Sequence, residues 1–271
     1  MRLTLTLIIL STTLLSNAQQ KLIYLDDNGK SVSEKKASTL EQHIKINDTL
    51  YEVNTYTVDG PRSTSIQYND PKGESLNGRY ITYDRKGNGS SVVLYSHGLK
   101  HGTAYFLTPT HRVLRTETYE KGRLIAKKDS TTLNAEAEKY RDSIKQLPNP
   151  PEEKESEFPG GIPGWSKYLN QTLRYPDHAV DKNIQGSAIV AFIVGKDGRI
   201  EQDNTYLETS AEYYLDTEAL RIIRICPDWI PATQGGKQVR SWKKQPIIYK
   251  LEIQKKQPLP TQQINLQLNI T

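Results

Sequence analysis

The apolar stretch over residues 186–194 constrains the fold of this chain more than any other segment. It is apolar at nearly every position, and a strand of that composition needs cover on both faces of its sheet. The sequence Gly195-Lys196-Asp197-Gly198 follows directly, and Asp-Gly is typical of the tight turn of a β-hairpin. We therefore expect a buried strand over 187–194 that turns back into a partner strand over 199–207.

Two helices are expected to cover this hairpin. The first must end at Tyr175, because Pro176 disfavours a helical conformation in the residue before it. The second starts at Thr209, which matches a capping box with Glu212, and it ends at Pro227. The apolar residues of each helix recur at helical intervals and so share one face. They are Trp165, Tyr168, Leu169 and Leu173 in the first helix, and Leu215, Ala219, Ile222, Ile223 and Cys226 in the second.

A third strand completes this module beyond a turn at Gly235-Gly236. Apolar residues occupy alternate positions over 247–253, which is the period of a strand. Pro246 has no N–H to donate, so the strand must lie at a sheet edge or be bulged at that point. Three strands covered by two helices leave one edge that could accept an extended peptide through main-chain pairing.

The order of landmarks over residues 157–253 resembles the C-terminal domain of the TonB family, envelope proteins that grip outer-membrane transporters. The landmarks are Phe158-Pro159-Gly160-Gly161, Tyr175-Pro176, the apolar strand with its turn, and Cys226-Pro227-Asp228-Trp229. The resemblance implies a non-catalytic domain. It also implies that the last strand and the Tyr-Pro segment receive the short N-terminal peptide of a transporter.

The resemblance places the partner-binding residues of this chain in two stretches. The first is Arg174-Tyr175-Pro176, and the second is the strand over 239–249. Family members best known for this contact carry a glutamine-proline before the Tyr-Pro, whereas this chain has Thr172-Leu173-Arg174, so the contact there is expected to differ. The residues assigned to partner binding are Arg174, Tyr175, Pro176, Val239, Arg240, Trp242, Lys243, Ile247 and Tyr249.

The N-terminal half, residues 19–130, is expected to form an antiparallel domain of β-hairpins. Tyrosines and glycines recur there in short segments without a helical period, and some of them repeat at a spacing of 24 residues, as in Tyr95 with Tyr119 and Gly98 with Gly122. Over residues 68–125 this pattern resembles the MORN-type repeat variants of bacterial proteins. A β-sheet domain whose spacing arises by chance is the alternative. With the C-terminal module, the expected class is α+β.

Residues 131–156 are expected to connect the two domains as an amphipathic helix followed by a linker. Leu133, Ala137, Tyr140, Ile144 and Leu147 recur at helical intervals, and the prolines over 148–151 end the helix. The segment 148–163 reaches about 50 Å when fully extended. Energy-transducing TonB proteins use a much longer proline-rich segment, so coupling to their motor proteins is in doubt.

The two ends of the chain carry their own patterns. Arg2, the apolar run 3–15 and Ser16-Asn17-Ala18 predict a signal peptide over residues 1–18 and export to the periplasm. An uncleaved anchor is the alternative, but the run falls short of the ~20 residues that span a bilayer. In the tail, residues 255–271, apolar residues alternate over 264–270; an extra strand on an exposed edge and a disordered tail are both open.

Composition and motifs exclude several functions. The net charge of +5 is spread among mixed charges, which argues against nucleic-acid binding, and the cluster from Lys237 to Lys244 is typical of a solvated strand edge. The single cysteine, Cys226, cannot form an intramolecular disulfide. His97 and His101 flank glycines in an expected turn without a third metal ligand nearby. No nucleophile motif, cofactor motif or later membrane-spanning segment is evident, so we expect neither an enzyme nor a cofactor.

The sequence therefore predicts a periplasmic, non-enzymatic protein-binding module. Its domains are the β-hairpin domain 19–130, the helix and linker 131–156 and the TonB-like domain 157–254. Its partner is expected to be an outer-membrane TonB-dependent transporter or another envelope protein, bound by strand addition as a transport accessory. The alternative is a structural envelope protein that forms homodimers through the TonB-like domain, with no role in transport.

Overall fold

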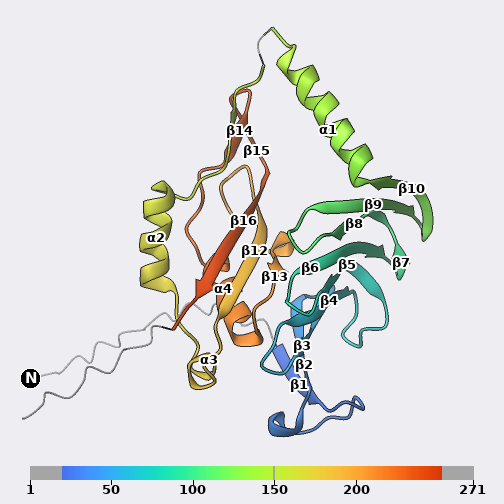
Figure 1. Ribbon diagram of the computed structural model, residues 1–271, viewed down its shortest axis with the longest axis vertical. Helices are drawn as coiled ribbons and strands as arrows, with labels where there is room; N and C mark the ends of the chain where they lie inside the picture. Colours follow the sequence, from blue (N-terminus) through green and yellow to red (C-terminus); the bar gives the residue numbers. More distant parts are fainter. Residues whose placement is uncertain (1–19, 149, 252–271) are drawn as a thin grey trace, which may run out of the picture.

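The structure is a computed structural model that describes residues 20–148 and 150–251 (Figure 1). It contains antiparallel sheets and separate helices, so the expected α+β class is confirmed. The expected signal peptide over 1–18 and the expected tail strand over 264–270 lie outside the described residues. Among the helices of the described residues, none has the length and apolar character needed to cross a membrane.

Residues 20–129 form one ten-stranded antiparallel sheet whose strands follow one another in chain order. Only β7 leaves this path, because it pairs with β6 alone. The strands are β1 (Gln20–Leu25), β2 (Thr39–Asn47), β3 (Leu50–Thr57), β4 (Arg62–Tyr68), β5 (Leu76–Tyr83), β6 (Gly89–Ser96), β7 (Leu99–Lys100), β8 (Gly102–Leu107), β9 (Val113–Glu120) and β10 (Arg123–Asp129).

Tight turns join these strands. The turn from β9 to β10 places Lys121 and Gly122 both at positive φ, 49° and 85°, which is the backbone twist that suits a two-residue hairpin. His97 and Gly98 take the same pair of conformations at 50° and 78°. Gly98 and Gly122 are the glycines that the 24-residue spacing relates, although the MORN-type resemblance itself stays a prediction.

The helix α1 (Ser130–Lys145) follows β10 without an intervening loop. Asp129 caps its first turn, because the carboxylate accepts a hydrogen bond of 2.8 Å from the backbone N–H of Thr132. Its first turns approach β9 and β10, yet none of its residues is buried. The helix and linker were expected over residues 131–156, and the cap at Asp129 explains why the helix starts at Ser130.

The C-terminal module contains a three-stranded antiparallel sheet in the order β13-β12-β16. Three aromatic landmarks of the sequence meet in its core: the ring of Phe158 lies 5.2 Å from that of Trp165 and 5.6 Å from that of Trp229. The elements are α2 (Gly161–Thr172), α3 (Asp177–Asp181), β12 (Gly186–Val194), β13 (Tyr206–Thr209), α4 (Tyr213–Arg224) and β16 (Ser241–Tyr249).

A second small sheet extends the module away from its core. It consists of β11 (Glu153–Lys154), β14 (Ala232–Gln234) and β15 (Lys237–Val239). Gly235 and Gly236 make the turn between β14 and β15 with φ of 57° and 77°. Because β11 pairs with β14, the end of the expected linker is part of the folded module.

Several boundaries expected from the sequence are wrong. The first helix, α2, ends at Thr172 rather than at the expected Tyr175. The capping box does not form: Thr209 ends β13, and Glu212 caps α4 with its own carboxylate, which accepts from the N–H of Tyr214 at 2.8 Å. The second strand covers only Tyr206–Thr209, because a 3₁₀ turn occupies residues 202–204. The third strand starts earlier than expected and ends at Tyr249 rather than Ile253.

The helix α4 joins the two halves of the molecule. One face, with Leu215 and Ile222, packs into the C-terminal core, while Tyr213 contacts Tyr56 of the N-terminal sheet with ring centroids 5.5 Å apart. The hydroxyl of Tyr83 donates to the carbonyl of Leu207 at 2.7 Å. The two halves therefore share a buried interface across α4 and β13.

That interface contains charged groups. The guanidinium of Arg62 is buried and donates to the hydroxyl of Tyr56, and the backbone N–H of Arg62 donates to Ser210 Oγ at 2.8 Å. The same serine hydroxyl donates to the buried carboxylate of Asp216 at 2.5 Å. Burial is the main cause that raises the pKa of Asp216, to about 6.

Candidate protein-interaction site

The strand β16 lies at the edge of the C-terminal sheet (Figure 1). It pairs with β12 along its whole length, from Ser241 opposite Val194 to Tyr249 opposite Gly186. Within residues 20–148 and 150–251, no strand pairs with the other side of β16. The opposite edge, β13, is covered, because Asn88 forms a β-bridge with Thr209. The described part of the chain thus leaves one edge of this sheet for strand addition.

Pro246 determines which backbone groups of β16 point toward that open edge. It lies opposite Ile189, and because proline has no N–H, this pair takes the geometry in which the two residues do not exchange hydrogen bonds. The residues that alternate with Pro246 in the same register direct their N–H and C=O groups away from β12. Trp242, Lys244 and Ile248 therefore present N–H groups to an incoming strand.

The side chains of β16 alternate between the core and the surface. Ile247 and Tyr249 are buried, and by the same register their backbone groups face β12. These two predicted site residues therefore hold the strand in place and offer no group to an added strand. Trp242 and Ile248 point to the other face and are 54% and 58% exposed. Ile248 was missed in the sequence, although the strict alternation over 241–249 was the signal that could have found it.

The two stretches assigned to partner binding meet in the structure at Tyr175 and Tyr249. Their rings pack edge to face with centroids 5.7 Å apart. The hydroxyl of Tyr175 donates to the carbonyl of Ile184 at 2.7 Å, and that of Tyr249 donates to the carbonyl of Leu215 at 3.0 Å. Burial raises the pKa of both phenols, so both stay protonated as donors.

Glu218 holds the residues before Tyr175 against α4. One oxygen of its carboxylate accepts from the backbone N–H of Arg174 at 2.8 Å, and Arg221 binds the carboxylate at 2.6 and 2.7 Å. Arg221 also donates to the carbonyl of Thr172 at 2.8 Å. The hydrogen bonds that Arg221 donates to Glu218 raise the pKa of its guanidinium. The Tyr-Pro segment is thus held by polar contacts that leave the Arg174 side chain exposed.

A groove of about 470 Å³ runs beside the Tyr-Pro segment. The N-terminal sheet contributes Gln20 to its wall, and α4 contributes Tyr213 and Tyr214. Arg174, Tyr175 and Pro176 form the remaining side with their neighbours. The predicted peptide contact is therefore lined by both halves of the chain.

The cations near β16 are paired with carboxylates from other segments. Arg240 binds Glu201 at 2.5 and 2.6 Å, which lowers the pKa of that glutamate. Lys243 binds Glu155 at 3.0 Å, and Lys244 binds Glu208. Arg240 precedes β16, and Val239 ends β15, where it pairs with Ala232, so these two predicted residues lie outside the open edge.

The described residues offer little to catalysis or metal binding. Within them, no three His, Cys, Asp or Glu side chains gather in a way that could hold a metal ion. Cys226 is half-buried, its sulfur accepts from Trp229 Nε1 at 3.3 Å, and burial raises the pKa of the thiol. Such a thiol is a weak nucleophile at neutral pH.

Residues 171–251 match the family model described as Gram-negative bacterial TonB protein C-terminal. This stretch is similar to the C-terminal domain of TonB proteins. The match runs from the end of α2 through β16 and does not reach the N-terminal sheet. No curated protein and no solved structure matches the chain.

The TonB C-terminal family comprises non-catalytic protein-interaction domains of Gram-negative envelope proteins, some of which contact outer-membrane transporters. The C-terminal part of this chain is therefore a TonB-related envelope protein-interaction module. The MORN-type resemblance over 68–125 has no such support and stays a prediction.

Proposed function

We propose that this protein acts in the periplasm and binds extended peptide segments of outer-membrane transporters, or of other envelope proteins, by adding them as a strand to β16. The observation that carries the proposal is the unpaired edge of β16 beside the Tyr175-Pro176 segment. Main-chain hydrogen bonds along such an edge supply affinity, and side-chain contacts supply specificity.

The chemistry of the edge indicates what kind of peptide it accepts. Three outward N–H groups, the carbonyls of the same three residues and the carbonyl of Pro246 can pair with a short extended segment, although Pro246 supplies no donor. Trp242 and Ile248 offer exposed apolar surface to side chains that point to the same face. At its far end the peptide would reach Pro176 and the groove beside it.

The N-terminal sheet gives the module a fixed second surface. It covers the β13 edge and shares a buried interface with α4. Among the described residues, an added strand could therefore pair with this sheet only at β16. The connection between the halves is short, since β11 is folded onto β14. We therefore assign the protein an accessory or adaptor role in transport.

A titration of the full chain with N-terminal peptides of outer-membrane transporters from the same cell tests the proposal. We expect backbone amide shifts in two stretches, residues 174–177 and 241–249. The variant Lys244→Pro removes one outward N–H without breaking a bond to β12 and should weaken binding about tenfold, as expected for the loss of one or two hydrogen bonds. Lys244→Ala is the matched control, because it also loses the pair with Glu208 but keeps the N–H.

The second candidate is self-association through the same edge. It is favoured by the exposure of Trp242 and Ile248 on an unpaired strand, which a second copy of β16 could cover. A tight dimer formed in this way would leave no edge for a peptide. Mass measured over a concentration series, for the chain and for Lys244→Pro, separates the two: only edge pairing makes the dimer sensitive to that substitution.

A further inference from the structure

The helix α1 presents an apolar stripe that the described chain does not cover. In Figure 1 it rises from the last strand of the N-terminal sheet toward the linker that leads to the C-terminal module. None of its residues is buried; Tyr140 is 62% exposed, and Leu147, just beyond the helix, is 45% exposed. A helix of 16 residues is marginal in water unless its apolar face packs against something. The exposed apolar stripe of α1 therefore indicates that another surface packs against this helix.

The spacing of the stripe identifies the kind of partner. Its apolar residues recur at intervals that alternate strictly between four and three, which is the heptad pattern of a coiled-coil seam rather than the broader face of a helix on a sheet. In heptad letters, Ala137 and Ile144 occupy a positions, and Leu133, Tyr140 and Leu147 occupy d positions. The partner that fits such a seam is another helix.

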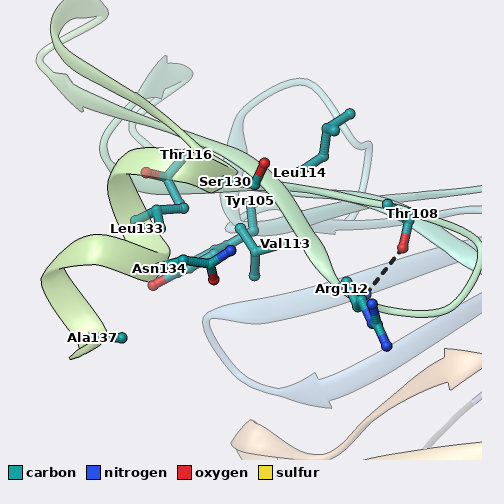
Figure 2. A pocket seen from close by; sticks show the side chains of 10 residues that line it. All are labelled: Tyr105, Thr108, Arg112, Val113, Leu114, Thr116, Ser130, Leu133, Asn134 and Ala137. Carbon is teal, nitrogen blue, oxygen red and sulfur yellow. Dashed lines mark hydrogen bonds between the residues drawn. The ribbon is translucent and has the colours of Figure 1, made fainter. Parts of the chain in front are cut away.

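Space for a second helix lies beside the first turns of α1. A groove of about 720 Å³ lies between α1 and the sheet. Figure 2 shows the side chains that line it. Leu133 and Ala137 form the helix side of the groove, and Tyr105, Val113 and Thr116 form the sheet side. The stripe continues from this groove into open solvent at Tyr140, so a helix could lie in the groove at one end and along α1 at the other.

The charged residues beside the stripe indicate which helix pairs with α1 and whether the two helices run parallel or antiparallel. Glu136 precedes an a position and is a g residue, and Arg141 follows a d position and is an e residue. In a parallel pair of identical helices, each g residue meets the e residue five positions on in the other helix, which brings Glu136 to Arg141 twice. In an antiparallel pair, g residues face g and e residues face e, so the two never meet.

We propose that two copies of this chain associate through α1 as a parallel two-helix pair, with Glu136 of each copy binding Arg141 of the other. In the single chain Glu136 binds Lys128 at 2.8 Å, an exposed pair that contributes little and does not prevent a second contact. The pair leaves β16 open in both copies. It therefore yields a bivalent peptide binder and is independent of the proposed peptide-binding function.

Sedimentation of the full chain over a concentration series tests this pairing. The unmodified chain should dimerise reversibly. Arg141→Glu places like charges at both contacts and should raise the dimer Kd about tenfold, and adding Glu136→Lys should restore it. Lys139→Glu, a similar charge change on the far side of the same helix, should leave Kd unchanged. A monomer at every concentration, or a dimer that responds equally to Arg141→Glu and Lys139→Glu, would overturn the proposal.

Disulfide cross-linking tests the direction of the helices. In a chain carrying Cys226→Ser, the variant Ile144→Cys should form a disulfide-linked dimer on mild oxidation, because equivalent a positions are adjacent only in a parallel pair. Lys139→Cys should not cross-link at the same rate. Equal cross-linking by both variants would reflect random collision and contradict the parallel pair. Both chains should keep the circular dichroism spectrum of the unmodified protein.

Discussion

The ring of Tyr175 packs edge-on against the ring of Tyr249, with their centroids 5.7 Å apart. This contact joins the segment that follows α2 to the last residue of the edge strand β16, although the two tyrosines are far apart in the sequence. It also brings together the two stretches that the sequence predicts to bind a peptide, the Tyr-Pro segment and the end of β16. Tyr249 itself is buried, so its role is to hold the end of the edge strand in position.

Shortening Tyr249 should therefore destabilise the module. Tyr249→Ala removes a buried aromatic ring and should lower the free energy of unfolding by about 3–5 kcal/mol. Tyr249→Phe keeps the ring and loses only the hydrogen bond to the Leu215 carbonyl, so it should cost about 1 kcal/mol. Urea unfolding measures both. Equal effects from the two variants would show that the ring packing is not what holds the strand.

The interface between the two halves should be sensitive to Gly87. Its φ is +84°, and a Cβ atom there would lie 2.0 Å from the backbone oxygen of Ser210. Gly87→Ala should therefore force the N-terminal sheet away from β13. The matched control is Gly98→Ala, which has a similar φ of +78° but no atom within 4 Å of the added Cβ.

Both alanines carry the same backbone strain, so the difference between them isolates the clash. We expect the free energy of unfolding of Gly87→Ala to be about 1–3 kcal/mol lower than that of Gly98→Ala, which is the usual cost of inserting an atom into a packed region. Urea unfolding followed by tryptophan fluorescence provides the comparison. Indistinguishable variants would contradict a tight contact between Gly87 and Ser210.

The interface should be sensitive to the loss of either of its two buried charged groups, Arg62 and Asp216. Arg62→Met removes the positive charge that favours the ionised form of the buried Asp216 carboxyl and leaves that carboxylate uncompensated, so it should cost about 3–5 kcal/mol. Combining it with Asp216→Asn should cost less than the sum of the two single changes, because no uncompensated charge remains. Additive losses in urea unfolding would show that the two groups do not interact.

Stability should depend on pH through Glu212. Burial raises the pKa of this carboxyl to about 7 in the folded chain, above its ordinary value of 4.5. The folded state therefore binds the proton more tightly than the unfolded state, so stability should rise as pH falls from about 7 toward 4.5. Asp216, with a pKa raised to about 6, acts in the same direction at lower pH.

The variant Glu212→Gln isolates this effect, because glutamine keeps the oxygen that caps α4 but does not titrate. Its stability should vary less between pH 7.5 and pH 5.5 than that of the unmodified chain. A pH dependence that is the same in both chains would contradict the raised pKa.

Much of the C-terminal fold could be predicted because its signals are local. The apolar run over 187–194 became β12, and the spacing of Trp165 and Tyr168 indicated α2, although that helix ends at Thr172 rather than at Tyr175. The capping box failed because Thr209 belongs to a strand whose pairing with Ile189 outweighs a local capping preference. The short helix α3 was missed because five residues carry no helical period.

The candidate site was predicted in part, and its limits have a physical cause. The sequence placed Tyr175 and Tyr249 at the site, but their contact depends on α4. The Leu215 carbonyl of this helix binds the Tyr249 hydroxyl, and its Glu218 side chain binds the backbone of Arg174, next to Tyr175. The interface of Arg62 with Ser210 and Asp216 had no local signal, since these residues are brought together only by the packing of the two halves. Which residues of β16 face outward followed from its register with β12.

The peptide titration that compares Lys244→Pro with Lys244→Ala tests the central claim most directly. The account predicts amide shifts over 174–177 and 241–249 in the unmodified chain, affinity close to that chain in Lys244→Ala, and binding about tenfold weaker in Lys244→Pro. Equal affinity in all three chains, or shifts confined to other segments, would contradict strand addition at β16.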